Sequence, residues 1–200
     1  MSFGAPQSKL QVLADFVTAL GHSAFRVGDA LGMLAFDAHE RADLFMPALL
    51  SRGVGEVMAS MLSNCEGTAG SSDGLEEAAL HLAGRHGLIF LASDFHWPLG
   101  RLDGVLDLLA HSYIVPLVIW DPSEVQPPKR DGLMPLRDVE SGHRSTVWLR
   151  PSMRARWRDA VERRRAELNT LFAARGIRPF YMSGGFDGEA LSQYFFEATA

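Results

Sequence analysis

Apolar residues recur at the spacing of an amphipathic helix in six segments of the chain. Between residues 7 and 25, for example, Leu10, Leu13, Val17 and Ala24 fall on one face of a helix. The other segments with this pattern are 53–64, 75–87, 100–112, 151–176 and 188–198. The pattern therefore predicts six helices.

Short apolar segments between turn residues predict the strands. Segments 31–37 and 42–47 are separated by polar residues, which is typical of a hairpin of two strands. The other candidate strands are 88–93, 113–121, 146–150 and 177–183. Pro116 weakens one of them, because proline cannot donate a hydrogen bond to a sheet ladder. Residues 122–145, with four prolines, are predicted to be a long polar connection.

The order of these elements predicts the fold class. Helices and strands alternate through most of the chain, which is typical of a mainly parallel sheet with helices on both faces. We therefore expect an α/β fold. Folds of this class bind their ligands in the crevice at the carboxyl ends of the strands.

Two aspartates end successive predicted strands. Asp94 follows residues 88–93, and Asp121 closes residues 113–121. Because strands linked by a crossover run in the same direction, both carboxylates should emerge at one edge of the sheet, within reach of one divalent ion. The hydroxyls that could join such a site are those of Ser93, Thr68, Ser71 and Ser72. The alternative, which spacing alone favours, is that each aspartate caps the helix or turn that follows it.

Composition narrows the function classes. The chain has 200 residues, 47% of them hydrophobic and 22% charged, so we expect one globular domain over residues 1–200. A net charge of -5 disfavours nucleic-acid binding. The single cysteine, Cys65, suits a reducing, cytoplasmic location. No apolar run is long enough to cross a membrane.

The arginines of residues 149–165 raise the question of phosphate binding. Acids are mixed among them, and Asp159 and Arg163 have the acid-first spacing of a helix-surface pair. This segment is therefore predicted to be a solvated helix face above a buried stripe of Trp157, Val161, Leu168 and Leu171. No nucleophile elbow, phosphate-binding loop or metalloprotease histidine pair is found, so no catalytic residue is assigned.

Two short motifs lie at the ends of predicted strands, and a third lies in the polar connection. They are Ser93, Asp94 and Phe95; Asp121, Pro122 and Glu124; and Leu136, Asp138, Glu140 and Gly142. Together with Gly28-Asp29, they resemble the bacterial family called domain of unknown function 58, and the similarity extends from Met1 to the C-terminal helix. The resemblance implies a three-layer, Rossmann-like, von Willebrand factor A-like fold whose mainly parallel sheet has one antiparallel edge strand.

The resemblance also implies a magnesium site of the kind found in integrin-type domains. Asp94 matches the aspartate of the third ligand loop, and Thr68 or Ser72 would supply the second. The first ligand loop and the central strand would lie upstream of Met1. We therefore expect an incomplete site here and Mg²⁺ only in the full-length protein, since Asp94 and one hydroxyl supply too few oxygens. The missing strand would expose two strand edges, so we expect the sheet to rearrange or to form a homodimer.

Two functions are weighed. The resemblance implies a cytoplasmic, non-enzymatic protein-interaction module that works with a MoxR-type AAA+ ATPase in the assembly or activation of other proteins. Its contact surface would consist of Ser93, Asp94, Asp121 and Glu124, and in the full-length protein a metal would bridge Asp94 to an acidic partner side chain. The alternative is a Mg²⁺-dependent hydrolase or nuclease in which Asp94, Asp121 and Glu124 hold ions that activate water. The lack of an evident general base favours the first.

Overall fold

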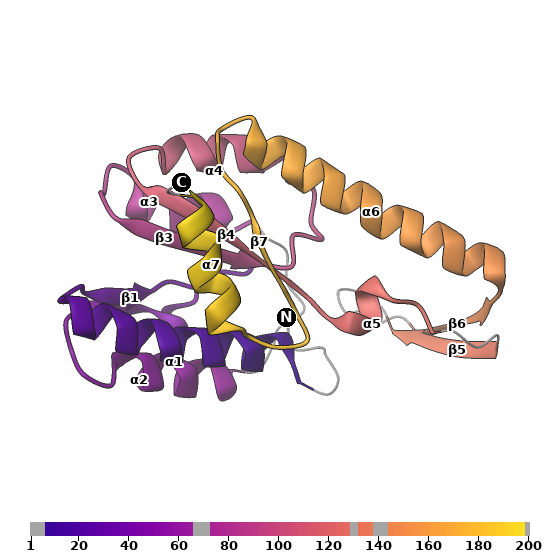
Figure 1. Ribbon diagram of the computed structural model, residues 1–200, viewed down its shortest axis with the longest axis horizontal. Coiled ribbons are helices and arrows are strands. Elements are labelled where there is room, and N and C mark those ends of the chain that lie inside the picture. Colours follow the sequence, from indigo (N-terminus) through magenta and orange to yellow (C-terminus); the bar gives the residue numbers. More distant parts are fainter. Residues whose placement is uncertain (1–6, 66–72, 129–131, 138–143, 199–200) are drawn as a thin grey trace.

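The computed structural model describes residues 7–65, 73–128, 132–137 and 144–198. Helices and strands alternate along most of this length (Figure 1). The helices are α1 (Lys9–Val27), α2 (Val54–Ser63), α3 (Leu75–Leu82), α4 (Leu102–Leu108), α5 (Pro122–Val125), α6 (Pro151–Ala173) and α7 (Gly188–Ala198), with short 3-10 helices at Ala42–Leu44 and Leu99–Arg101. The six predicted helices are confirmed, and the short α5 is an addition.

Three parallel strands form the central sheet. They lie in the order β3 (Leu88–Ser93), β4 (Tyr113–Trp120) and β7 (Phe180–Ser183). Ser93 lies opposite Val118, so β3 and β4 run side by side in the same direction. The prediction that both apolar runs belong to one parallel sheet is confirmed. Asp94 and Asp121 therefore follow their strands at the same edge.

Pro116 lies within β4 without breaking the sheet. The N–H of Tyr113 donates to the carbonyl oxygen of Gly87, on the β3 side. Because backbone groups alternate in direction along a strand, the nitrogen of Pro116 faces away from β3. On that other side, the pairing with β7 begins only at Leu117. The proline therefore removes no hydrogen bond from the pairing with β3, and the strand forms despite it.

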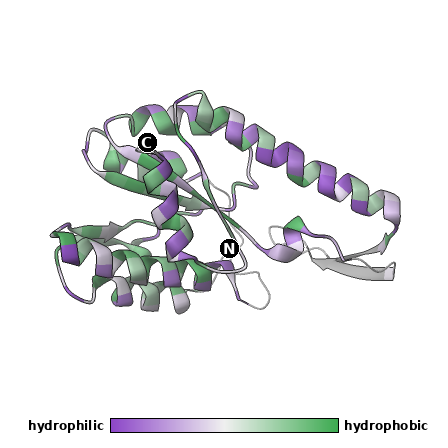
Figure 2. Cartoon of the chain, in the orientation of Figure 1, coloured by the Kyte–Doolittle hydropathy of each residue, from purple (hydrophilic) through white to green (hydrophobic). Residues whose placement is uncertain are grey.

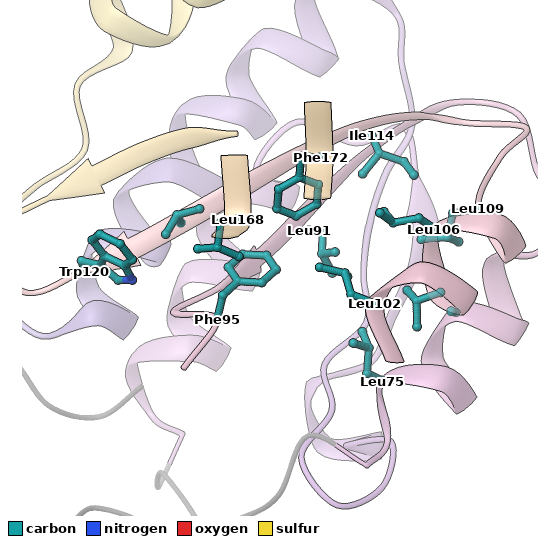
Figure 3. Packing of buried hydrophobic residues seen from close by; sticks show 13 residues of the cluster. Leu75, Leu91, Phe95, Leu102, Leu106, Leu109, Ile114, Trp120, Leu168 and Phe172 are labelled. Atoms are coloured by element: carbon teal, nitrogen blue, oxygen red, sulfur yellow. The ribbon is translucent and has the colours of Figure 1, made fainter. Parts of the chain in front are cut away.

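Helices cover both faces of the sheet, as predicted. Val115 and Leu117 of β4 pack in one core with α1, α2 and α7. Ile114 and Trp120 of the same strand pack in a second core with α3, α4 and α6, around the completely buried Phe95 (Figure 3). Side chains that alternate between two cores are expected of a strand that is buried on both faces.

Two antiparallel pairs lie outside the parallel sheet. The predicted antiparallel pair is confirmed as β1 (Leu31–Met33) and β2 (Met46–Leu49), which form a sheet of their own. Its strands are shifted from the predicted segments 31–37 and 42–47, because Ala42–Leu44 forms a 3-10 helix instead of a strand. No antiparallel edge strand joins the parallel sheet among the described residues. The second pair is β5 (Gly132–Arg137) with β6 (Arg144–Leu149). The prediction of a polar connection is wrong for β5, because a two-stranded sheet has only edge strands and these tolerate Pro135.

Two glycines let α1 and α2 pack closely. A Cβ atom at Gly55 would lie 2.6 Å from the carbonyl oxygen of Val17, and a Cβ at Gly21 would lie 2.6 Å from the backbone of Gly55. Backbone atoms this close cannot move aside unless a helix shifts. The two helices therefore meet through their main chains at this point.

Gly55→Ala is expected to lower the free energy of unfolding by about 1 to 3 kcal/mol, the usual cost of overpacking. The matched control is Gly104→Ala in α4, where an added Cβ meets nothing within 4 Å. Alanine favours a helix over glycine by up to about 1 kcal/mol, so Gly104→Ala should stabilise the protein. Urea unfolding followed by circular dichroism compares the two variants, and stabilisation by both would contradict the close packing.

The helix α6 extends well beyond the sheet, towards β5 and β6 (Figure 1). Leu168 and Phe172, in its second half, are its buried residues, whereas its first half is mainly hydrophilic (Figure 2). The predicted stripe is thus only partly buried, since Trp157 and Val161 remain half-buried. Within the described ranges, no helix combines the length and the apolar character that a membrane span requires.

Candidate functional site

The turn after β3, residues 93–97, is shaped by the side chain of Ser93. Its hydroxyl oxygen accepts hydrogen bonds from the backbone N–H of Phe95 and from the indole N–H of Trp97, each at 3.0 Å. Phe95 has a φ of 51°, in the left-handed region that bulky residues rarely adopt. Backbone strain of this kind persists where surrounding contacts enforce it, often at functional sites.

Two other elements hold this turn in place. Arg164 of α6 donates from Nε to the carbonyl oxygen of Phe95 at 2.9 Å and from a terminal nitrogen to that of Trp97. The indole N–H of Trp120, at the end of β4, donates to the carbonyl oxygen of Asp94 at 2.8 Å. Ser93 itself is 8% exposed. Its role in the described structure is therefore to shape the turn.

Asp121 caps α5, which confirms the capping alternative for this residue. Its Oδ1 accepts from the backbone N–H of Ser123 at 2.7 Å, and Oε2 of Glu124 accepts from the backbone N–H of Asp121 at 3.0 Å. This reciprocal arrangement is a capping box. Asp121 is only 3% exposed. The acid that shares the Lys9 ammonium with Asp94 is Glu124, whereas the Oδ1 atom of Asp121 caps its own turn.

Lys9 links the turn after β3 to the turn after β4. Its Nζ lies 3.0 Å from Oδ2 of Asp94 and 2.7 Å from Oε1 of Glu124. The Lys9 side chain is 5% exposed, so both ion pairs lie in a poorly hydrated region, where charges interact more strongly than in water. Asp94 also accepts from the backbone N–H of His96 at 3.3 Å, so it caps its turn as well. Lys9, Asp94 and Glu124 together form the lysine cluster.

Sequence reasoning did not identify Lys9, although a signal for it exists. Lys9, Val12 and Phe16 share the apolar face of α1, and all three are buried. A lysine on a buried face needs a carboxylate partner. Its partner Asp94 is 85 residues away, so no local pattern indicates which acid it is.

The lysine cluster favours the ionised form of both acids. Burial raises the pKa of the Glu124 carboxyl, but His96, Lys9 and the backbone N–H of Asp121 outweigh it and lower that pKa to about 2. Burial likewise opposes ionisation of Asp94, and Lys9 and His96 hold its pKa below the ordinary value. Carboxylates stabilised in this way take up protons poorly near neutral pH. They are therefore weak candidates for a general base.

The described part of the site does not fit a divalent cation. Mg²⁺ demands near-octahedral coordination by oxygen. Here Asp94 and Glu124 both direct an oxygen atom at the Lys9 ammonium, so a metal ion at these oxygens would lie beside a buried positive charge. The other predicted participants, Thr68, Ser71, Ser72, Asp138, Glu140 and Gly142, lie outside the described residues. A magnesium site that uses Asp94 and Thr68 stays a prediction.

A pocket of about 360 Å³ opens beside the lysine cluster. The sheet edge contributes one wall, in which the His96 ring is nearly parallel to that of Trp120, with centroids 6.0 Å apart. The helix α6 contributes the other wall. The lining residues are His96, Trp120, Glu124, Val125, Trp157, Ala160, Val161 and Arg164. The carboxyl edge of the sheet therefore combines an internally paired charge cluster with a mainly apolar pocket.

Comparison with known proteins identifies the family. Residues 1–167 match the family described as "Protein of unknown function DUF58". The match ends within α6, so β7 and α7 lie beyond it, and it is shorter than the predicted similarity up to the C-terminal helix. No curated protein and no solved structure matches the chain. Because this match covers most of its length, the chain belongs to the DUF58 family, whose function is unknown.

Proposed function

We propose that this chain is a non-enzymatic protein-interaction module that works with a MoxR-type AAA+ ATPase in the assembly or activation of other proteins. The proposal includes a von Willebrand factor A-like arrangement of the sheet, a cytoplasmic location and the expected homodimer. Its contact surface is the carboxyl edge of the parallel sheet, around Asp94 and Glu124. Ser93 and Asp121 support this surface from below, since both are buried in their turns.

The observation that carries the proposal is the pocket beside the lysine cluster. An apolar hollow with a few fixed polar groups at its rim is the usual form of a recognition site. The two turns that form its sheet wall are held by Ser93, Lys9 and the capping box, so the surface is preorganised. A preorganised surface loses less conformational entropy when a partner binds.

The same contacts disfavour the hydrolase alternative. Asp94 and Glu124 both pair with the Lys9 ammonium, and Asp121 is engaged as a helix cap. A metal-dependent hydrolase needs such acids as metal ligands or as a base. In the described arrangement, all three acids have structural partners instead. The proposal therefore assigns no catalytic residue.

The experiment is a binding titration between the purified chain and the MoxR-type ATPase from the same genome. Asp94→Asn removes one charge of the edge and is expected to weaken binding about tenfold or more. The matched control is Asp29→Asn, an exposed acid that follows the far end of α1. This variant should bind like the wild type. Absence of wild-type binding, or equal binding by Asp94→Asn, would count against the proposal, provided that circular dichroism shows the variant to be folded.

A further inference from the structure

The pocket offers mainly ring and aliphatic carbon to whatever enters it. The indole N–H of Trp157 donates to the carbonyl oxygen of Glu124 at 2.6 Å, and that of Trp120 donates to Asp94. Both indole N–H groups are therefore satisfied inside the protein. Val125 and Val161 complete an apolar lining. Such a pocket favours an aromatic or large aliphatic side chain, because buried aromatic anchors dominate the energy of interfaces.

The α6 side of this pocket is strongly basic. Residues 150–165 contain seven arginines and only two acids, a net charge of +5. Arg156 and Arg158 are exposed on the first half of the helix, which lies beyond the sheet (Figures 1 and 2). A concentrated positive surface attracts acidic partners and repels basic ones. Charge complementarity therefore points to an acidic segment.

Arg165 places part of this charge against Trp120, one of the residues that line the pocket. Its guanidinium lies over the rings of Trp120 and Tyr181, 5.6 Å and 5.0 Å from their centroids. Its Nε is buried and has no hydrogen-bond partner in the described part of the chain. A guanidinium that is held by two rings and retains donors is suited to bind a carboxylate. Arg165 follows Val161 of the pocket wall by one helical turn.

We propose that the pocket binds one aromatic or large aliphatic side chain of an acidic peptide segment of a partner protein, and that Arg165 and its neighbours on α6 pair with the carboxylates of that segment. This inference rests on the proposed interaction function and adds the chemistry of the partner. The apolar anchor supplies the contact with the pocket. The acids supply orientation and the preference over uncharged or basic segments.

In the first test, short random peptides that bind the wild-type chain are selected from a phage library. Their affinities for the wild type and for two variants are then measured. Ala160→Trp fills the pocket from an exposed helix position, and Ala166→Trp makes the same change at an exposed position outside the pocket lining. The expected peptides share an aromatic or aliphatic residue flanked by Asp or Glu. They should bind Ala166→Trp like the wild type. They should bind Ala160→Trp more weakly than the wild type by about tenfold or more. Peptides without an acidic preference, or equally bound by both variants, would overturn the inference.

A second test addresses Arg165 with a selected peptide and its Asn/Gln analogue, which lacks the acids. The wild type should prefer the acidic peptide by about tenfold or more, and Arg165→Gln should lose most of that preference. Equal preference in both proteins would contradict the role of Arg165. Titration of the MoxR-type ATPase with the same variants separates the two proposals. If the ATPase does not bind but acidic peptides that depend on the pocket are found, the proposed function alone is refuted. If Asp94→Asn weakens ATPase binding but no such peptides are found, the inference about the peptide alone is refuted.

Discussion

Lys9→Met is expected to lower the free energy of unfolding by about 3 to 5 kcal/mol, because breaking a buried ion pair leaves its charged partner unpaired. The lysine serves two acids at once, at 3.0 Å from Asp94 and 2.7 Å from Glu124. Without its ammonium, two carboxylates would face each other in a site where the lysine side chain is 5% exposed. Methionine fills a similar volume, so the loss would report charge and not a cavity. Urea unfolding followed by circular dichroism measures it.

Two further variants separate this effect from a general effect on α1. Gln11→Met introduces the same methionine at an exposed position of the same helix without removing a charge, and should alter stability by no more than about 0.5 kcal/mol. The triple variant Lys9→Met, Asp94→Asn, Glu124→Gln replaces all three charges and should recover much of the loss, as neutral replacements of buried ion pairs often do. A loss in Lys9→Met no larger than that in Gln11→Met would contradict the proposed pairing.

Acid is expected to destabilise the wild type more than it destabilises Glu124→Gln. The pKa of Glu124 is lowered to about 2 in the folded protein, from 4.5. A carboxyl with a lowered folded-state pKa stabilises the protein above its unfolded-state pKa, and this contribution is lost as the pH falls through the folded-state value. The loss therefore falls between about pH 4.5 and about pH 2, and it amounts to at most about 3 kcal/mol.

The comparison is made by urea unfolding at several pH values across this window. Glu124→Gln should show a smaller decrease than the wild type, since it lacks the titrating group. Glu197→Gln is the control, because the pKa of Glu197 is also lowered, by Arg178, but its side chain is 53% exposed. Solvent screening makes such surface pairs weak, so this variant should keep most of the wild-type decrease. Equal decreases in all three proteins would argue against the role of Glu124.

The sequence was sufficient to predict the parts of the fold that depend on local periodicity. The six helices follow from apolar spacing, and the parallel pair β3 and β4 follows from the alternating order of helices and strands. Pro116 shows the limit of such rules, because its effect depends on which side of β4 carries the partner strand at that point. β5 was missed because its short apolar run contains Pro135 and lies between polar segments, which is typical of a loop, and only the pairing with β6 makes it a strand.

The candidate site was predicted in position but not in its contacts. The edge that carries Asp94 and Asp121 follows from the direction of the strands. In the capping box, however, the Asp121 side chain binds within its own turn, and it is Glu124 that pairs with Lys9. Lys9, from the beginning of α1, completes the cluster across 85 residues of sequence. Contacts of this range depend on tertiary packing, so spacing along the chain could not indicate them.

The most direct test of the lysine cluster is a carbon-13 NMR titration of the Glu124 carboxyl, in the wild type and in Lys9→Met. If Lys9 pairs with Glu124, the wild-type carboxyl should titrate with a pKa of about 2, and its pKa should rise in Lys9→Met. A wild-type pKa near 4.5, or a value that does not change when Lys9 is replaced, would contradict the account.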